Sequence, residues 1–239
     1  MVTKRRQYVD EHGSAAALSS LARMLAPWPV ITEEARLPPD PPPMPPEEAV
    51  QVADSVTRRR VEFATGRLCA RRALARLGID RFILRNDARR APQWPPGIVG
   101  SLTHTGDVPG GYCAVALARA DAILTIGLDA EKADGLPVHL WRFVLTTAEQ
   151  AWLGAQDAGR RGLLAKVIFS AKESFYKAQF PLTGRTVGFH DVEVELDIPR
   201  GAFVTRAAKD PVAGLGGGCW TGRLCLDEEL VRTAIVVSR

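Results

Sequence analysis

The segment ILTIGLDAE, residues 123–131, alternates apolar residues with polar or small ones along its length. Side chains on a β-strand point alternately to its two faces, so this pattern predicts a strand with one face in the core. The core face is expected to carry Leu124, Ile126, Leu128 and Ala130. The opposite face ends in Asp129 and Glu131, which places two carboxylates at the end of a largely apolar strand.

A long helical pattern lies on either side of this strand in the sequence. Upstream, the proline-free segment from Glu47 to Leu77 carries apolar residues at helical spacing, and Gly78 fits its C-cap. Downstream, Leu163 to Phe180 shows the same periodicity and is expected to end at Pro181.

Shorter segments complete the pattern. The proline-rich residues 38–46 predict an extended connector, and the segment GSLTHTG, residues 100–106, predicts a loop. Tyr112 to Ala118 is short, apolar and typical of a strand. Residues 186–237 predict short strands and turns, with a flexible tip at residues 214–218.

Helix followed by strands, repeated once, predicts a mixed α+β (α/β) protein of two pseudo-symmetric halves. Each half is expected to be a small sheet packed on a long helix, and the halves are predicted to comprise residues 1–119 and 120–239. A chain of 239 residues is long enough for both halves to bury a core. Its hydrophobic fraction of 46% and charged fraction of 24% exclude a disordered or fibrous class.

The composition also bounds the cellular setting. The basic cluster at residues 4–6 is followed by Asp10 and Glu11, which is unlike a signal peptide. No uncharged run reaches the roughly 20 residues needed to span a bilayer, so the sequence predicts a cytoplasmic protein with no membrane partner. The net charge of +4 favours anionic partners such as nucleotides, phosphates or acidic proteins.

Asp129 and Glu131 are the first candidates for chemistry. Residues two apart on a strand project from the same face, about 6–7 Å apart at the backbone. Two carboxylates so placed can converge on a hard cation such as Mg²⁺, together with substrate phosphate oxygens. Gly127 leaves space beside them. The alternative is a strand end that merges into the charged stretch at residues 129–134.

The segment FSAKESFYK, residues 169–177, carries a second cluster on the downstream helix. Glu173 and Lys177 share one face, and Lys172 and Tyr176 form an adjacent ridge. An exposed ion pair of this kind is worth only about 0.3–0.5 kcal/mol. The apolar flanks indicate a partly buried helix, where charged residues need partners that a metal–phosphate site would supply.

The upstream helix is strongly basic, with seven arginines between residues 57 and 76. Arg60 and Arg67 are about two turns apart and share a face, which Arg71 continues. A solvated basic face is one interpretation and an anion site is the other. His104 lies in the Gly/Ser/Thr-rich segment downstream, where backbone N–H groups and hydroxyls can bind a phosphate, although a lone histidine is often structural.

Four segments considered together identify a family. They are RRxEFxxGRxCARxALxxLG at residues 59–78, PxWPxGxxGSLTH at 92–104, GxDxE at 127–131 and FSAKESxYK at 169–177. In order and spacing they resemble the Sfp-type 4′-phosphopantetheinyl transferase superfamily, and within it the enterobactin-synthetase-component-D-like group. The resemblance implies a pseudo-twofold monomer that binds coenzyme A in the cleft between its halves.

The resemblance also implies roles for individual residues. Asp129, Glu131 and Glu173 would hold Mg²⁺, and Asp129 would also face the coenzyme. Lys172 and Lys177 would contact its diphosphate. The residues implied around the 3′-phosphate and nucleotide are Arg59, Arg67, Thr103, His104 and Arg85. At the phosphate the motif favours Arg59, whereas the helical periodicity favours Arg60.

The implied reaction is phosphoryl transfer. A serine hydroxyl of an apo acyl or peptidyl carrier protein attacks the β-phosphorus of coenzyme A, and 3′,5′-ADP leaves. Glu173 would accept the serine proton, with Glu131 as the alternative, and Lys177 and Lys172 would stabilise the transition state. The group resemblance favours nonribosomal peptide, siderophore or polyketide synthesis.

Two other functions fit parts of the sequence. A non-catalytic relative could bind coenzyme A as a sensor, but it would not need a general base. A nucleic-acid-binding protein could use the arginine-rich helix, residues 58–76. That second function gives the three carboxylates no role, so the transferase, with no nucleic-acid partner, is preferred.

Overall fold

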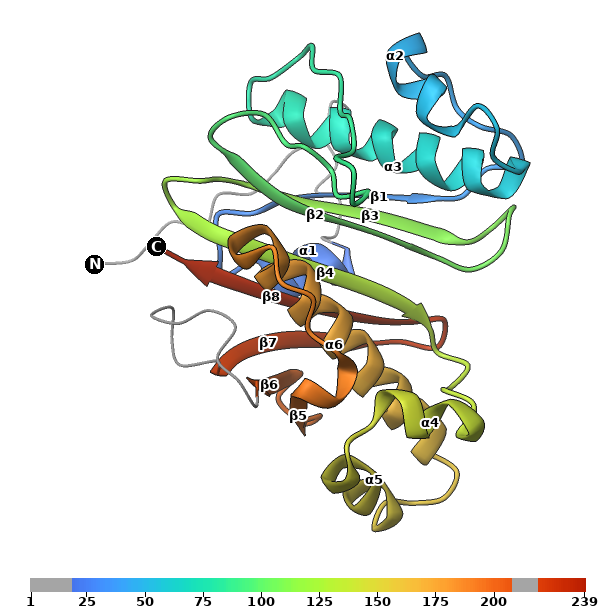
Figure 1. The fold of residues 1–239 in the computed structure, drawn as a ribbon, viewed down its shortest axis with the longest axis vertical. Coiled ribbons are helices and arrows are strands. Elements are labelled where there is room, and N and C mark those ends of the chain that lie inside the picture. The colour runs from blue at the N-terminus through green and yellow to red at the C-terminus, as the bar shows by residue number, and fades with distance from the viewer. Residues whose placement is uncertain (1–18, 208–218) are drawn as a thin grey trace.

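The computed structural model describes residues 19–207 and 219–239, and its strands form two antiparallel sheets (Figure 1). The first sheet has the strand order β1-β3-β2, and the second has the order β4-β8-β7-β6-β5. The first sheet consists of β1 (Ile31–Arg36), β2 (Ile98–Thr105) and β3 (Tyr112–Arg119). The second consists of β4 (Ile123–Lys132), β5 (Val192–Asp197), β6 (Ala202–Ala207), β7 (Cys219–Leu226) and β8 (Leu230–Ser238).

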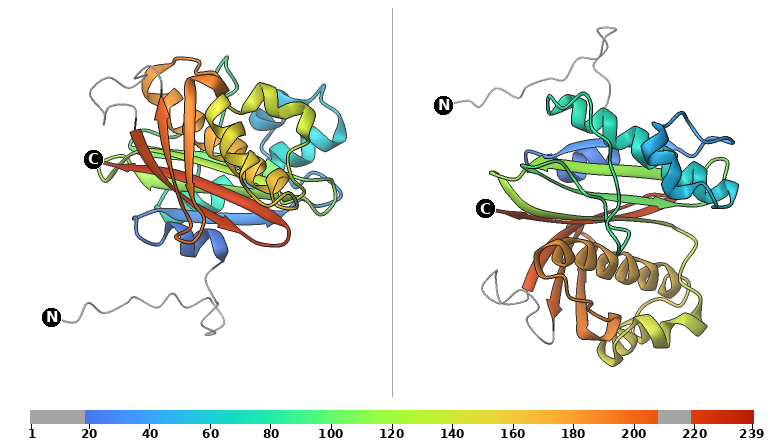
Figure 2. Two further views of the ribbon diagram at one scale, coloured as in Figure 1. Left: turned by 90° about the horizontal axis from the view of Figure 1, so that it is seen from below. Right: turned by 45° about the horizontal axis from the view of Figure 1, so that its top comes forward.

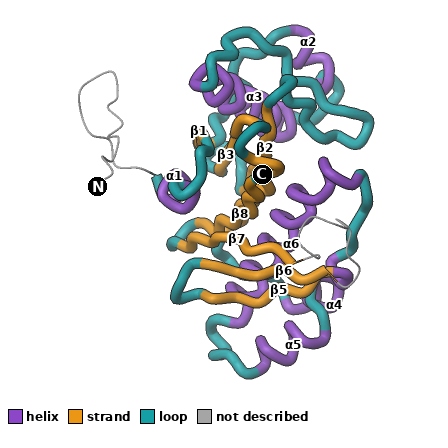
Figure 3. The backbone as a smooth tube through the Cα atoms, turned by 90° about the vertical axis from the view of Figure 1, so that its left-hand side faces the viewer, coloured by secondary structure: helices purple, strands orange, loops and turns teal. Residues whose placement is uncertain are grey.

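One long helix packs on each sheet, α3 (Thr57–Arg76) on the first and α6 (Arg161–Thr183) on the second (Figure 2). The two helices lie on opposite outer sides with the sheets between them, and the tube in Figure 3 shows the same layers from the side. The shorter helices are α1 (Ser20–Leu25), α2 (Pro46–Ala49), η1 (Val50–Val52), α4 (Val138–Val144), α5 (Thr147–Gly154) and η2 (Phe189–Asp191).

Strand β3 shows how the layers are held together. Its odd-numbered residues pack under α3 with Leu74, and they are Cys113, Val115 and Leu117. Its even-numbered residues face the second sheet, and they are Tyr112, Ala114, Ala116 and Ala118. The small alanines let the sheets pack closely, with Ile126 and Leu128 of β4 in the same core. A third core lies between α6 and the second sheet.

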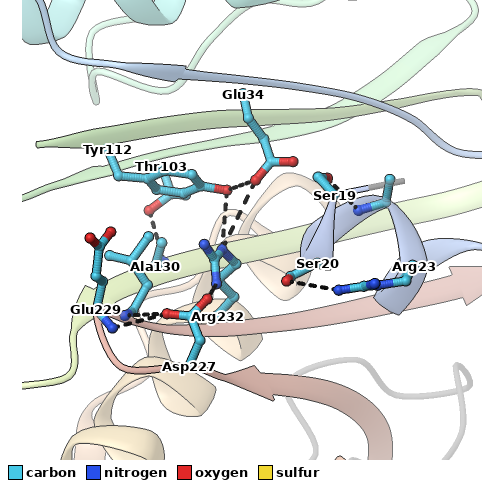
Figure 4. Close-up of polar contacts among 12 residues, drawn as sticks. Ser19, Ser20, Arg23, Glu34, Thr103, Tyr112, Ala130, Asp227, Glu229 and Arg232 are labelled. Atoms are coloured by element: carbon cyan, nitrogen blue, oxygen red, sulfur yellow. Dashed lines mark hydrogen bonds and ion pairs between the residues drawn. The ribbon is translucent and has the colours of Figure 1, made fainter. Parts of the chain in front are cut away.

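The two sheets meet at their edge strands β2 and β4, which side chains join. The backbone N–H of Leu128 donates to Ser101 Oγ (3.0 Å), and the N–H of Ala130 donates to Thr103 Oγ1 (3.1 Å). Figure 4 shows the second of these bonds. Residues 101 and 103 point to the same side of β2, so they satisfy alternate donors along the outer edge of β4.

The other face of β4 lies against α6. A Cβ atom on Gly127 would come within 1.8 Å of the carbonyl oxygen of Ser174, so only glycine permits this approach. One turn further along α6, the carbonyl oxygen of Ala178 accepts a hydrogen bond from Thr125 Oγ1 (2.7 Å). Asp129 is two residues beyond Gly127 and is therefore held close to α6.

A polar network joins the halves on the other side of the sheets (Figure 4). The hydroxyl of Tyr112 donates to the carboxylate of Glu34 and accepts from Arg232 Nε (3.4 Å). Arg232 also donates to Asp227 Oδ2 (2.6 Å). The guanidinium is buried, and these partners on β1, β3 and the β7–β8 turn offset its desolvation.

The predicted α+β class, with a sheet packed on a long helix in each half, is confirmed. The strands predicted at residues 112–118 and 123–131 are present, and residues 186–237 contain β5 to β8. The division at residues 119 and 120 stays a prediction, and the tip expected at residues 214–218 lies outside the described residues. Within those residues, no helix has both the length and the apolar character to cross a bilayer.

Three boundaries were predicted wrongly. The helix expected from Glu47 is broken into α2, η1 and α3. The buried carboxylate of Glu48 accepts from the backbone N–H of Leu84 (3.0 Å) and from Arg71 NH1 (2.6 Å), which ties α2 to the side of α3 rather than in line with it. The loop expected at residues 100–106 is instead most of β2, since β3 supplies a pairing partner along its length. Helix α6 continues past Pro181 to Thr183 and ends at Gly184, whose φ is 62°.

Candidate active site

A cavity of about 870 Å³ lies between the two halves. Residues of α3 and β2 line one wall, and residues of β4 and α6 line the other. The charged and aromatic residues that line it include Arg59, Glu62, Arg67, Trp94, His104, Asp129, Tyr176, Lys177 and Phe180. A site between two rigid sheet–helix layers can hold a large ligand against both walls at once.

Arg59 and His104 form the basic part of the first wall. Arg59 NH1 lies 3.1 Å from His104 Nε2, and Glu62 Oε2 lies 3.7 Å from His104 Nδ1. A guanidinium can only donate, so Nε2 accepts and the proton of the neutral ring is on Nδ1, facing Glu62. Burial lowers the pKa of His104, while the charge of Glu62 opposes that shift. The first wall therefore presents Arg59 as its cation beside a neutral imidazole.

Arg67 lies about two turns after Arg59 on α3, and its guanidinium is held by more contacts than that of Arg59. Its Nε donates to the carbonyl oxygen of Leu84 (2.9 Å), and its guanidinium stacks 4.0 Å from the ring centroid of Phe63. NH2 also donates to Asn86 Oδ1. Burial lowers the pKa of Arg67 to about 10, which still leaves it charged at neutral pH. Arg67 thus lines the cavity as a pre-positioned cation.

The structure separates the two candidate phosphate residues at the start of α3. Arg59 lines the cavity, whereas Arg60 is exposed and does not. Arg85 is also exposed and absent from the cavity wall, so its place near a nucleotide stays a prediction. Its loop instead contributes Arg89 and Arg90.

Arg89 was missed in the sequence and reaches across the cavity to the second half. Its NH1 donates to the carbonyl oxygen of Gly184 (2.6 Å), and its guanidinium lies 5.4 Å from the ring centroid of Phe180. That contact depends on how a loop crosses the cleft, which no local pattern indicates. Phe180 itself stacks on Tyr176, with ring centroids 5.3 Å apart.

Asp129 is the buried centre of the second wall, with only 4% of its surface exposed. Its Oδ1 accepts from Lys177 Nζ (2.7 Å) and Thr103 Oγ1 (3.3 Å), and its Oδ2 accepts from Ser170 Oγ (2.8 Å). Thr103, expected near a phosphate, lines the cavity but also links β2 to this carboxylate. Ser170 was not predicted, although it lies in the quoted segment at residues 169–177.

Glu131 and Glu173 lie beside Asp129 and outside the cavity lining. Burial, together with the charges of Asp129 and Glu173, raises the pKa of Glu131 to about 7. Burial and the charge of Asp129 likewise raise the pKa of Glu173. Lys166 Nζ lies 3.7 Å from Glu131 Oε2 and offsets part of this repulsion. The three carboxylates crowd negative charge that a bound cation would relieve.

The donor chemistry of this cluster fits a hard divalent ion. In the described part of the chain, however, no three carboxylate, imidazole or thiol side chains converge as a ready metal centre. Mg²⁺ commonly uses only one or two carboxylates and takes its other ligands from water and substrate phosphates. The cluster is therefore suited to an ion that arrives with a phosphorylated ligand.

Lys172 does not lie in the cavity, which corrects its expected place at a diphosphate. Only 3% of its surface is exposed, and its ammonium donates to the carbonyl oxygens of Val144 and Phe189 (both 2.8 Å) and to Glu149 Oε2 (2.7 Å). These three bonds use all of its N–H donors. Helical spacing places Lys172 on a ridge beside Glu173, but it does not reveal that α4 and α5 cover that ridge.

Two family models match successive parts of the chain. The 4′-phosphopantetheinyl transferase N-terminal domain matches residues 47–118, and the 4′-phosphopantetheinyl transferase superfamily matches residues 125–214. The first match contains Arg59, Arg67 and His104, and the second contains Asp129 and Lys177. The two matches therefore supply opposite walls of the cavity.

Individual relatives agree with the family models. The chain is 41% identical to 4′-phosphopantetheinyl transferase Svp of Streptomyces mobaraensis, over 81% of this chain and 78% of that protein. It is 39% identical to 4′-phosphopantetheinyl transferase PptT of Mycobacterium tuberculosis, over 80% and 85%. Enterobactin synthase component D of Salmonella typhimurium is 31% identical over 51% of this chain and 48% of its own length.

The four sequence segments, the two family matches and the shared cavity agree on one assignment: this chain belongs to the 4′-phosphopantetheinyl transferase superfamily.

Proposed function

We propose that this enzyme transfers the 4′-phosphopantetheine group of coenzyme A to a serine of an apo carrier protein, and that it releases 3′,5′-ADP in a Mg²⁺-dependent reaction. One observation carries the proposal. A single cavity joins the cations Arg59 and Arg67 to the ion pair of the buried Asp129 and the partly exposed Lys177. Such a cavity suits a ligand with phosphates at two places, as coenzyme A has.

The basic wall would bind the nucleotide end of coenzyme A. Arg59 and Arg67 both line the cavity, and charge-assisted hydrogen bonds from guanidinium groups to phosphate are strong and directional. The neutral His104 accepts from Arg59 at Nε2 and so orients that guanidinium without adding a second buried charge. Arg89 is placed to cover the bound nucleotide, since it already bridges the two walls.

Asp129, Glu131 and Glu173 would hold Mg²⁺ together with oxygens of the diphosphate. The ion would supply neutralisation of negative charge on the diphosphate. Lys177 would add a second positive charge at the same place, because its ammonium already lies 2.7 Å from Asp129 Oδ1. Coulombic stabilisation of this kind is the largest contribution in most phosphoryl transfers.

The serine must lose its proton as its oxygen bonds to the β-phosphorus and the bond from that phosphorus to the bridging oxygen breaks. Glu173 would accept this proton, and Glu131 is the alternative. Burial and the charge of Asp129 raise the pKa of each carboxyl in the metal-free protein, and a bound ion would lower it again, so each would be ionised and able to accept the proton. The leaving 3′,5′-ADP carries the bridging oxygen away.

The proposed protein partners are acyl or peptidyl carrier proteins of nonribosomal peptide, siderophore or polyketide synthesis. The similarity to an enterobactin synthase component supports the siderophore case. Acidic carriers would also be attracted by the net charge of +4. The enzyme would act in the cytoplasm as a monomer, and the monomer is supported by the fact that one chain supplies both walls of the cavity.

Contacts of the arginines on α3 favour the transferase over a nucleic-acid-binding protein. Three arginines outside the cavity wall are already bound: Arg58 donates to Glu62 Oε1 (3.0 Å), Arg71 to Glu48 Oε2 (2.6 Å) and Arg76 to Glu33 Oε1 (2.7 Å). Arginines that already bind their own chain are poorly placed to neutralise a row of phosphates.

The direct test is intact-protein mass spectrometry of apo carrier proteins incubated with the enzyme, coenzyme A and Mg²⁺. We expect a gain of one phosphopantetheine that EDTA abolishes. Coenzyme A binding without transfer to any carrier would favour the sensor function, and absence of both would refute the proposal.

A further inference from the structure

The buried ammonium of Lys172 is a hub that joins α6 to the elements around it. Its acceptors come from three places outside the helix: Val144 at the end of α4, Glu149 in the first turn of α5, and Phe189 in η2. Lys172 and Glu149 are each only 3% exposed. Such a charged pair persists in a core only if every donor and acceptor is satisfied.

Glu149 extends the hub to further backbone groups. Its Oε2 accepts from the N–H of Thr146 (2.7 Å) in a capping box, and its Oε1 accepts from the N–H of Val194 (2.8 Å) in β5. The side chain therefore fixes the start of α5 and one strand of the second sheet at the same time. Through Lys172, both are tied to α6.

The opposite side of α6 is fixed by hydroxyls. Ser170 Oγ lies 2.8 Å from Asp129 Oδ2 and 2.9 Å from Thr233 Oγ1, and Ser174 Oγ donates to the carbonyl oxygen of Thr233 (2.9 Å). Helix α6 is thus held on two sides, and both its rotation and its height above the sheet are set. Glu173 lies between these two sets of contacts.

We propose that Lys172 and Glu149 are a positioning pair: they fix the rotation of α6 and so direct Glu173 and Lys177 toward Asp129. Lys172 acts through the helix and touches no substrate. The inference rests on the proposed transferase function for its catalytic consequence, but the pairing itself can be tested by stability alone. Removal of either partner leaves a buried charge without a counter-ion, whereas neutralisation of both does not.

The test is a double-mutant cycle with Lys172→Met, Glu149→Gln and the double variant. A matched control is the cycle of Lys177→Met and Asp129→Asn, whose pair has the same 2.7 Å separation on the same helix but lies in the cleft. Three quantities are measured for each variant: the melting temperature, the Kd for coenzyme A, and kcat for a carrier protein well below the melting temperature.

Each single variant of the positioning pair should lower the melting temperature by about 10 °C. In the folded Lys172→Met enzyme, kcat should fall about 10- to 100-fold through misplacement of the catalytic groups, with the Kd for coenzyme A changed less than about threefold. The double variant should recover most of the lost melting temperature, because it leaves no unpaired buried charge, whereas its kcat should stay low with the Kd for coenzyme A little changed, because the contacts that position α6 are gone. The Lys177/Asp129 double variant should not recover kcat, because both groups act on the substrate.

Three results would overturn the inference. The first is weaker coenzyme A binding in Lys172→Met that the double variant does not restore, which would indicate that Lys172 contacts the diphosphate directly. An unchanged kcat in folded Lys172→Met would make the pair structural only, and additive melting temperatures would show no pairing. If the wild-type enzyme modifies no carrier, the proposed function fails, while the melting temperatures of the cycle still decide whether the pair exists.

Discussion

Lys177 Nζ lies 2.7 Å from Asp129 Oδ1 and 3.1 Å from the carbonyl oxygen of Leu128, so the lysine of α6 is bound to the strand that carries the central carboxylate. The two residues are 48 positions apart in the sequence. Their contact brings together two segments that the sequence shows only separately, and it lies in the cleft where both halves meet.

Replacement of Asp129 by alanine should abolish transfer. The substitution removes the carboxylate that accepts from Lys177 and Ser170. We therefore expect at least about a 100-fold fall in kcat. The fold should persist, because the neighbouring hydroxyls also bind Thr233. The rate is measured by carrier mass spectrometry and the fold by circular dichroism. As a control, Asp134→Ala removes an exposed carboxylate of the same region and should leave the rate within about twofold. Wild-type turnover by Asp129→Ala would exclude a role of Asp129 in binding the metal or the phosphates.

Arg59→Ala and Arg60→Ala should differ although the residues are adjacent. Arg59 lines the cavity beside His104, so its loss should raise the KM for coenzyme A about 10-fold, with a smaller change in kcat. Arg60 is exposed outside the cavity and should have no measurable effect. Steady-state kinetics with varied coenzyme A compare the two variants. An effect confined to Arg60→Ala would reverse the assignment.

Glu131 should make the metal-free protein less stable as the pH rises. Its pKa is about 7 in the folded state, against an ordinary value of 4.5, so between these values the folded state binds more protons than the unfolded state. Its contribution to the free energy of unfolding therefore decreases from pH 4.5 to pH 7, by at most about 3 kcal/mol. Without metal, Glu131→Gln should be more stable than wild type at pH 8 and equal to it near pH 4.5. Denaturant titrations at both pH values test this; equal stabilities at pH 8 would contradict the raised pKa.

Mg²⁺ should act in the opposite direction. A divalent ion bound by ionised carboxylates stabilises the folded state more at pH 8 than at pH 5, because protons compete with it at low pH. Melting temperatures with and without Mg²⁺ and coenzyme A, at both pH values, measure the effect. The difference should be smaller in Glu173→Gln, and an equal shift in that variant would remove Glu173 from the ion site.

Tyr112→Phe should destabilise the contact between the halves. The substitution removes the hydroxyl that bonds Glu34 and Arg232 and leaves a buried guanidinium with one partner fewer. We expect a loss of about 1–3 kcal/mol and a fall in melting temperature of several degrees. Tyr176→Phe removes a hydroxyl from a half-buried ring and is the comparison. Equal melting temperatures for the two variants would show that the network contributes nothing.

Patterns along single elements were read correctly from the sequence. The alternation at residues 123–131 predicted both faces of β4 except at Leu124, because side-chain direction on a strand is set by the backbone. The pairing with β8 shifts register between Ile123 and Thr125, so Leu124 lines the cavity and Ile123 takes its expected place in the core. Helical spacing likewise predicted the shared face of Glu173 and Lys177. Gly127 was interpreted as space beside the carboxylates; the structure shows that the space is filled by α6, whose backbone approaches at that point.

Features that depend on distant contacts were not predictable in this way. Helical periodicity favoured Arg60 over Arg59, but a long side chain follows its partners, and here His104 and Glu62 lie beside Arg59. Lys172 was expected at the diphosphate from the family resemblance, and the sequence does not show that α4 and α5 cover its side of α6. Arg89 reaches Gly184 only because a loop crosses between the halves.

The hydroxyl contacts between β2 and β4 bear on how this protein could be divided for use as a split reporter. Fragments cut near residue 121 would each present a bare sheet edge, β2 in one and β4 in the other, because Ser101 and Thr103 cover that edge only when both pieces are together. Bare edges recruit other strands and promote aggregation. The two fragments would therefore have to be produced in the same cell, and soluble complementation from separately purified pieces is not expected.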